Sequence, residues 1–136
     1  MTDTISQHTL TAYYTAFNAA DAAGMLACVS DDVEHRVNEG GIRHGAAKFA
    51  EFCAHMGVSY RETLLDIEIF VNEGGSRAAA EFVVHGEYLQ TDPGLPIATG
   101  QRYILPAGAF FDLKDGKITR ITTFYNLNDW IAQVGA

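Results

Sequence analysis

Apolar residues recur every three or four positions in the first part of the chain, a spacing typical of amphipathic helices. This spacing predicts helices at residues 5–20, 22–30 and 46–57. In the first of them, Tyr13 falls at the centre of the apolar stripe and Tyr14 falls at its edge. We therefore expect Tyr13 to point into the protein and Tyr14 to pack at the margin of the helix.

The hydrophobic period changes to two in the other segments, which predicts β-strands. A first strand is expected at residues 31–37, with His35 on its apolar side. Four longer alternating segments and a short closing helix follow the third helix, at residues 61–71, 78–90, 101–114, 117–127 and 128–135. In the first of these segments we assign the odd-numbered residues to the buried face and Glu62, Asp66 and Glu68 to the opposite face.

Helices followed by a run of antiparallel strands indicate an α+β protein. We predict one domain, residues 1–136, with a curved, mainly antiparallel sheet. Three N-terminal helices are expected on one side of this sheet, so that sheet and helices enclose a cone-shaped cavity. A cavity of that shape is a natural small-molecule pocket.

The chain carries 17 acidic and 9 basic residues, for a net charge of −8. Nucleic acids and anionic membranes are bound through basic patches, so neither is expected as a partner. The N-terminus lacks the features of a signal peptide, and we expect a cytoplasmic protein. Cys28 and Cys53 are expected to be reduced, small apolar side chains. The sequence has no metal motif or phosphate-binding glycine loop, so we expect no cofactor.

Several segments, in their order and spacing, resemble the NTF2-like superfamily, and most closely its SnoaL-like and ketosteroid-isomerase-related branch. They are YYTAFNAADAAGML, the DDV before the first strand, HGEYLQTDPGLPIATGQRY and LKDGKITRI, with Gly86-x-Tyr88 in the most specific piece. The resemblance covers nearly the whole chain and implies the cystatin-like, cone-shaped fold of that superfamily. The superfamily includes isomerases, cyclases, dehydratases, epoxide hydrolases and non-catalytic binders, so the fold does not give the reaction.

The resemblance also implies altered chemistry. Ketosteroid isomerases pair a helix tyrosine with a protonated aspartate as an oxyanion hole and use a second aspartate as the base. The tyrosine matches Tyr13, but the positions of the two aspartates match Val37 and Gly108. We therefore expect no steroid isomerisation. Tyr88 stands where SnoaL-type cyclases place a histidine, so that group has changed as well.

Alternation and the resemblance together place a set of polar and aromatic side chains toward the cone. We take Tyr13, His35 and Glu39 as candidate catalytic residues, because a buried phenol can donate to a forming enolate and histidine can shuttle a proton near neutral pH. The predicted ligand contacts are Asn38, Arg61, Phe82, Tyr88, Phe110 and Tyr125, and the same face is assigned Thr63, Arg102 and Thr123.

Each candidate also has a purely structural interpretation. Tyr13 can be a core tyrosine whose hydroxyl meets a backbone carbonyl, and His35 can be a strand histidine with satisfied hydrogen bonds. Asn38 and Glu39 lie beside a Gly-Gly turn, which accounts for both residue types. Arg61 can reach solvent from the end of a strand.

The functional hypothesis is a cofactor-independent isomerase, cyclase or dehydratase that acts on a small, mostly apolar carbonyl or hydroxyl compound. The alternatives are a module that binds an apolar ligand without turnover, and a structural dimerisation domain. Residues 103–111 are apolar on both faces, and Ile118 and Phe124 continue the outer patch. Because an exposed apolar patch usually meets a partner, we predict a homodimer through the outer face of the last strands.

Overall fold

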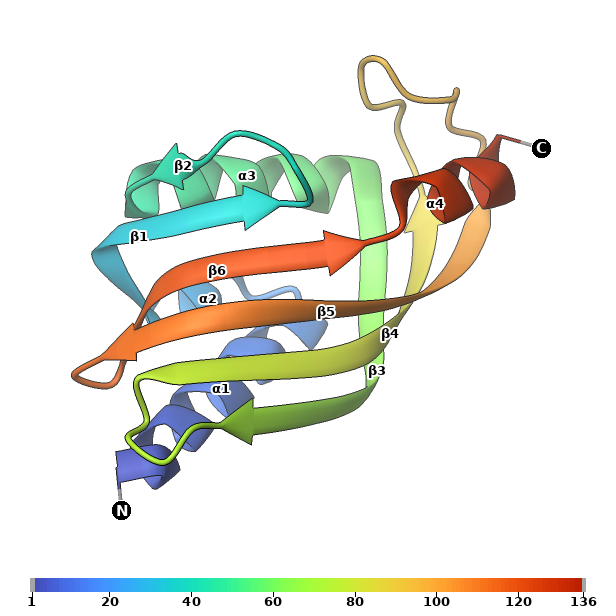
Figure 1. Ribbon diagram of the computed structural model, residues 1–136. Coiled ribbons are helices and arrows are strands. Elements are labelled where there is room, and N and C mark those ends of the chain that lie inside the picture. The colour runs from blue at the N-terminus through green and yellow to red at the C-terminus, as the bar shows by residue number, and fades with distance from the viewer. Residues whose placement is uncertain (1, 136) are drawn as a thin grey trace.

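The computed structural model describes the backbone of residues 2–135 and the side chains of residues 5–135 (Figure 1). Within this range the chain forms one sheet and four helices. Their order is α1 (Thr2–Asn18), α2 (Ala22–Leu26), β1 (Val29–Val37), β2 (Arg43–His44), α3 (Ala46–Ser59), β3 (Tyr60–Val71), β4 (Arg77–Tyr88), β5 (Arg102–Lys114), β6 (Lys117–Tyr125) and α4 (Leu127–Val134). The predicted α+β class is confirmed. The second helix is shorter than predicted, because Val29 already begins a strand.

The six strands are arranged in the order β2-β1-β6-β5-β4-β3. Neighbouring strands are antiparallel except β1 and β6, which run parallel and pair His35 with Ile121. The sheet is strongly curved: α1, α2 and α3 lie on its concave side, and α4 lies at one end beside the loop that follows β4 (Figure 1). The prediction of a curved, mainly antiparallel sheet with its helices on one side is therefore confirmed.

A β-bulge in β3 changes which of its side chains point inward. The pairing of β3 with β4 shifts between Leu65 and Glu68, and Asp66 between them has a positive φ of 55°. Side chains alternate between the two faces of a strand, so an extra residue exchanges the faces on either side of the bulge. Leu64 is accordingly buried, whereas Leu65 is 44% exposed. The faces predicted for residues 61–65 are therefore reversed.

The core lies between the concave face of the sheet and the helices. Deeply buried side chains from several elements fill it, among them Leu10, Val33, Phe49, Phe111 and Ile121. Burying each such side chain contributes roughly 1.5–3 kcal/mol to stability. In the described part of the chain, no helix is both long enough and apolar enough to cross a membrane.

Candidate functional site

Aromatic side chains from α1, α3 and the sheet fill the floor of the cone. The rings of Tyr13 and Tyr14 meet edge-on, with 5.2 Å between their centroids. Tyr13 also packs against Phe111, at 6.3 Å, and Tyr14 packs against Phe82, at 5.5 Å. Tyr13 is buried as predicted, but the placement of Tyr14 at the helix margin is wrong, because the two are 6% and 5% exposed. The curved sheet covers enough of α1 to bury two adjacent positions.

The ionisable groups of this floor are uncharged at neutral pH. Burial raises the pKa of Tyr13 and of Tyr14, and the neighbouring Tyr14 adds to the effect on Tyr13. Burial also raises the pKa of Cys53, to about 11, so that its thiol stays protonated. Neither phenol hydroxyl has a hydrogen-bond partner among the described residues. Both are therefore unpaired donors, and the alternative in which Tyr13 meets a backbone carbonyl is not what the structure shows.

His35, on β1, is buried against two phenylalanine rings of α3. Its ring centroid lies 4.9 Å from that of Phe49 and 4.5 Å from that of Phe52. Burial, and to a lesser degree the positive charge of Arg43, lowers the pKa of His35 to about 4. Within the described residues its Nδ1 has no hydrogen-bond partner. His35 is therefore a neutral, inward-pointing residue, and the interpretation with satisfied hydrogen bonds is wrong for Nδ1.

A carboxyl group and a phenol meet on the concave face near α4. Glu62 points inward because it precedes the bulge, and the hydroxyl of Tyr103 donates a hydrogen bond of 2.5 Å to its Oε2. The pair spans three strands, since Glu62 on β3 is paired with Gly86 on β4, and Gly86 with Tyr103 on β5. The indole ring of Trp130 in α4 packs edge-on against Tyr103, at 6.0 Å.

This pair has the properties of an acid–base group. Burial raises the pKa of Glu62, and the hydrogen bond from Tyr103 acts in the opposite direction. The pKa of Tyr103 is also raised, first by burial and then by the negative charge of Glu62. The phenol therefore keeps its proton, while Glu62 binds a proton more readily than an exposed glutamate does. A carboxyl group of this kind is suited to general acid–base catalysis.

The proline- and glycine-rich loop after β4 is anchored next to this pair. One carboxylate oxygen of Asp92 accepts a hydrogen bond of 2.8 Å from the Tyr60 hydroxyl, and the other lies 3.1 Å from Nε2 of His55. The Tyr88 hydroxyl accepts a hydrogen bond from the Asp92 amide, at 2.9 Å, and donates one to the Pro96 carbonyl, at 2.7 Å. Tyr88 points inward as predicted, but its hydroxyl forms hydrogen bonds with the loop, where a ligand contact was predicted.

Tyr125 brings an unpaired phenol to the same end of the cone. Burial raises the pKa of Tyr125, and the carboxylates of Glu62, Asp92 and Glu39 raise it further. Its hydroxyl has no hydrogen-bond partner in the described part of the chain, so it is free to donate to a bound molecule. Asn38 fixes the backbone here, because its Oδ1 accepts a hydrogen bond of 2.9 Å from the Tyr125 amide. Asn38 has a φ of 52° and Glu39 is exposed, as the turn interpretation expects.

Several residues assigned to the cone point away from it. The side chain of Arg61 is 68% exposed, and its Nη1 lies 3.5 Å from Oε1 of Glu87. This agrees with the alternative interpretation, in which Arg61 reaches solvent. Arg102 is exposed, and Phe110 is 49% exposed on the convex face. The bulge accounts for Arg61. In β5 the odd-numbered residues point inward, which directs Arg102, Phe110 and also Gly108 outward. The predicted ligand contacts Arg61 and Phe110 are therefore corrected, and so is the assignment of Arg102.

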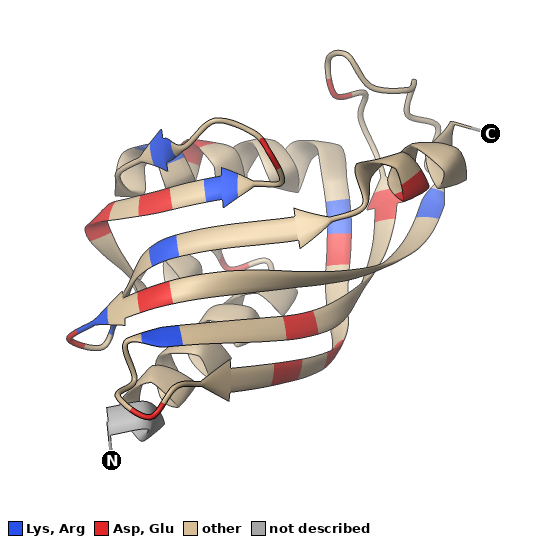
Figure 2. Ribbon diagram, in the orientation of Figure 1, with Lys and Arg blue, Asp and Glu red and all other residues tan. Residues whose placement is uncertain are grey.

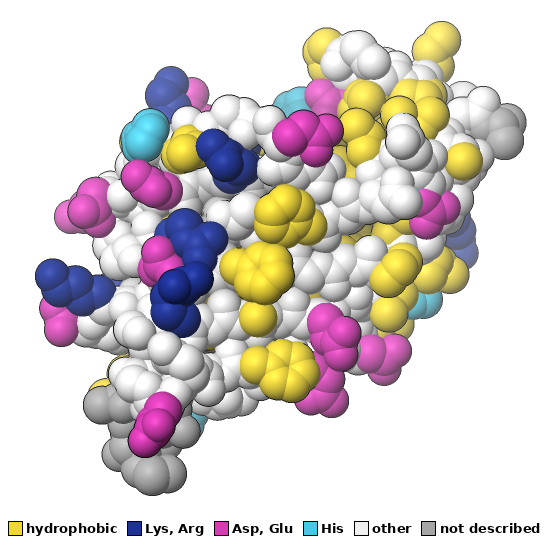
Figure 3. All heavy atoms as spheres, in the orientation of Figure 1, with side chains coloured by type: hydrophobic (Ala, Val, Ile, Leu, Met, Phe, Trp, Pro, Cys, Tyr) yellow, Lys and Arg dark blue, Asp and Glu magenta, His cyan; other side chains and the backbone are white. Residues whose placement is uncertain are grey.

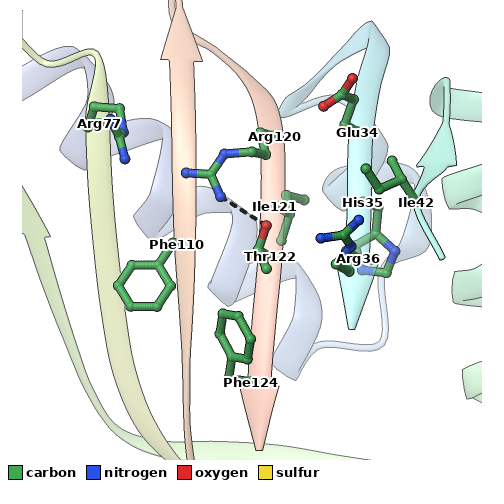
Figure 4. A pocket seen from close by; sticks show the side chains of 10 residues that line it. All are labelled: Glu34, His35, Arg36, Ile42, Arg77, Phe110, Arg120, Ile121, Thr122 and Phe124. Carbon is green, nitrogen blue, oxygen red and sulfur yellow. Dashed lines mark hydrogen bonds between the residues drawn. The ribbon is translucent and has the colours of Figure 1, made fainter. Parts of the chain in front are cut away.

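The convex face carries a hollow of about 360 Å³, lined by arginine and phenylalanine side chains (Figure 4). Basic residues of β1, β4 and β6 gather there, and exposed apolar side chains lie beside them (Figures 2 and 3). Arg120 is held by two hydrogen bonds to Asp112, of 3.0 and 3.2 Å, and the rings of Phe110 and Phe124 meet at 5.9 Å. Ile118, expected in this outer patch, is fully buried. This hollow is on the opposite side of the sheet from the cone.

Sequence reasoning missed Glu62, Tyr103 and Trp130. The visible sign of the bulge is the adjacent apolar pair Leu64 and Leu65, which interrupts an otherwise alternating segment. The contact between Glu62 and Tyr103 has no local signal, because it joins residues 41 positions apart. Across residues 2–135, no cluster of three or more histidine, cysteine, aspartate or glutamate side chains is placed to hold a metal ion.

Comparisons with known proteins agree with this architecture. The family model for SnoaL-like domains matches residues 10–121. A comparison with curated proteins gives no match. A candidate polyketide cyclase from Silicibacter sp. TM1040 is 60% identical, with 96% of each chain covered and a TM-score of 0.94. A second candidate polyketide cyclase, from Xanthomonas campestris pv. campestris, is 50% identical, with 98% of each chain covered and a TM-score of 0.94.

The fold is shared more widely than the sequence. An NTF2-like protein from Burkholderia xenovorans LB400 is 14% identical, yet 96% of each chain is covered and the TM-score is 0.77. That similarity bears on the fold alone, whereas the family match covers most of the chain. The protein therefore belongs to the SnoaL-like domain family, within the NTF2-like fold.

Proposed function

We propose that this protein is a cofactor-independent acid–base enzyme of the isomerase or cyclase type, acting on a small, mostly apolar carbonyl compound in the cone. Glu62 is the proposed base, and Tyr125 is the proposed hydrogen-bond donor to the carbonyl oxygen. The observation that carries the proposal is the inward carboxyl group of Glu62, which accepts a hydrogen bond from the Tyr103 hydroxyl. Its negative charge also raises the pKa of Tyr125, whose hydroxyl has no partner among the described residues.

The proposed first step is enolisation. The Glu62 carboxylate takes a proton from the carbon next to the carbonyl group, and the electron pair of that C–H bond forms a carbon–carbon double bond. The carbonyl oxygen gains the negative charge, which a hydrogen bond from Tyr125 stabilises in a site of low dielectric. In an isomerisation, Glu62 returns the proton to another carbon. In a cyclisation, the enolate carbon attacks a second carbonyl group, and Glu62 protonates the new alkoxide.

The cyclisation branch is supported by the names of similar chains, because the Silicibacter and Xanthomonas proteins described above are both candidate polyketide cyclases. A ring of that kind closes when an enolised carbon attacks a carbonyl group. The three candidate catalytic residues of the sequence have supporting roles in this proposal. Tyr13 remains an additional donor at the floor, His35 shapes the floor as a neutral side chain, and Glu39 acts on Tyr125 through its charge.

The test measures enolisation directly and does not require the natural substrate. A panel of alicyclic and aryl ketones is incubated with the protein in D₂O, and exchange of the hydrogens next to the carbonyl group is followed by NMR. We expect exchange above the solution rate for at least one compound. Glu62→Gln should reduce it by about a hundredfold or more, the usual contribution of a general base, and Tyr125→Phe should also reduce it.

The matched control is Glu81→Gln, which removes an exposed carboxylate from β4. This variant should exchange the ketones at the wild-type rate. Equal rates for wild type and Glu62→Gln, or no exchange above background across the panel, would contradict the proposal.

A second class of function has its own support. Aromatic side chains occupy the floor of the cone, and Ile104, Phe110 and Phe124 are 55%, 49% and 47% exposed on the other side of the sheet. These features favour a binding or dimerisation module of the NTF2-like type. Native mass spectrometry and the exchange assay together separate the two classes: a small molecule that co-purifies with the wild type and not with Tyr125→Phe, without any exchange of ketone hydrogens, supports a binding module with its ligand site in the cone.

A further inference from the structure

Gly86 leaves a gap on the concave face that the ring of Tyr103 occupies. A Cβ atom at position 86 would overlap the ring carbons of Tyr103 and lie 2.5 Å from its hydroxyl oxygen. Because the overlapping atoms belong to a rigid ring with 2% exposure, the ring could not stay in place beside a larger residue. The side chain of Tyr103 therefore crosses β4 only because residue 86 is glycine.

The crossing has one chemical consequence. Gly86 lies between its partners on the two adjacent strands, so a side chain that passes over it from β5 reaches Glu62 on β3. The Tyr103 hydroxyl bonds Oε2 of Glu62, while Oε1 has no hydrogen-bond partner among the described residues. One carboxylate oxygen is thus fixed, and the other remains available to a proton.

We propose that Tyr103, seated over Gly86, is the positioning residue for Glu62: it fixes one oxygen of the carboxyl group and keeps the group ionised and ready to accept a proton through the other. This inference rests on the proposed role of Glu62 as a base. Two effects compete at this carboxyl group. Burial favours the protonated form, and a donated hydrogen bond favours the ionised form. Without the phenol, burial acts unopposed.

The test follows the protonation of Glu62 itself. Protein labelled with ¹³C at the glutamate side-chain carboxyl carbon is titrated by NMR, and Glu62→Gln identifies the signal of Glu62. Tyr103→Phe removes only the hydroxyl, so the variant should fold. It should raise the titration midpoint of Glu62 by about one pH unit or more, the usual worth of a hydrogen bond to a charged group. Tyr14→Phe, which removes a buried phenol hydroxyl that does not contact Glu62, should leave the midpoint unchanged.

The role of Gly86 is tested by a double-mutant cycle. Gly86→Ala in the wild type should displace the ring and raise the midpoint as Tyr103→Phe does. In a Tyr103→Leu background the same glycine substitution should have no further effect, because the ring that it would displace is absent. Should Gly86→Ala fail to fold, the double variant should recover folding.

Two results would overturn the inference: an unchanged midpoint in Tyr103→Phe, or an equal effect of Gly86→Ala in both backgrounds. The titration does not depend on catalysis. If the midpoints shift as expected and no ketone is exchanged, the positioning role stands and the proposed reaction fails. If ketones are exchanged and the midpoint does not move, the reaction stands and the positioning role fails.

Discussion

Lowering the pH should destabilise this protein through His35, and replacing that residue should remove the effect. In the folded core, burial and the charge of Arg43 lower the pKa of His35 to about 4, whereas in the unfolded chain it is about 6.5. A group with a lowered folded-state pKa contributes its stability above the unfolded value. That contribution is lost as the pH falls toward the folded value.

The size of the effect follows from the two pKa values. The difference corresponds to about 3 kcal/mol in full, at about 1.4 kcal/mol for each pH unit. About 2 kcal/mol of this is lost between pH 7 and pH 4.5. The unpaired Nδ1 adds a cost that does not depend on pH, since a buried polar atom without a partner costs about 1–3 kcal/mol. His35→Leu removes both terms at similar side-chain volume.

The measurement is urea unfolding of the wild type and His35→Leu at pH 7 and pH 4.5. The free energy of unfolding of the wild type should fall relative to that of the variant by about 2 kcal/mol between the two conditions. His85→Gln, which replaces an exposed histidine, should follow the wild type. A difference between wild type and His35→Leu that stays constant from pH 7 to pH 4.5 would refute the reasoning, because His35 would then titrate alike in the folded and unfolded chains.

Three further expectations concern the floor, the outer face and the loop. Tyr13→Phe and Tyr14→Phe should each change the free energy of unfolding by less than about 1 kcal/mol, since neither hydroxyl has a described partner; a loss above about 2 kcal/mol in thermal or urea unfolding would reveal a bond. Light scattering should report a dimer for the wild type and a monomer for Phe124→Lys, and a wild-type monomer at micromolar concentration would exclude the outer-face interface. Asp92→Asn should speed hydrogen exchange in the loop after β4, because the bond from Tyr60 loses its charged acceptor; unchanged exchange would mean that other contacts hold the loop.

The order and type of the main elements follow from the hydrophobic pattern. The helical period around Leu10 and Phe49 and the alternation in β4, β5 and β6 each bury one face, and that requirement is local. The same alternation directed Phe82, Tyr88 and Tyr125 inward. Burial of Tyr14 could not be read from its helix, since the width of the buried stripe depends on how far the sheet curves around α1.

The sequence by itself determined the α+β class, the family resemblance and the burial of Tyr13, because periodicity and segment order are properties of neighbouring residues. The tertiary structure decided the candidate base. A β-bulge of one residue turns the side chain of Glu62 to the concave face. The sequence of β3 does not indicate that Tyr103, two strands away, lies in contact with it. The gap at Gly86 admits the Tyr103 ring only because the strand register places Gly86 between Glu62 and Tyr103. Register is fixed by packing and backbone pairing over the whole sheet, so chemistry that depends on it appears only in the folded molecule.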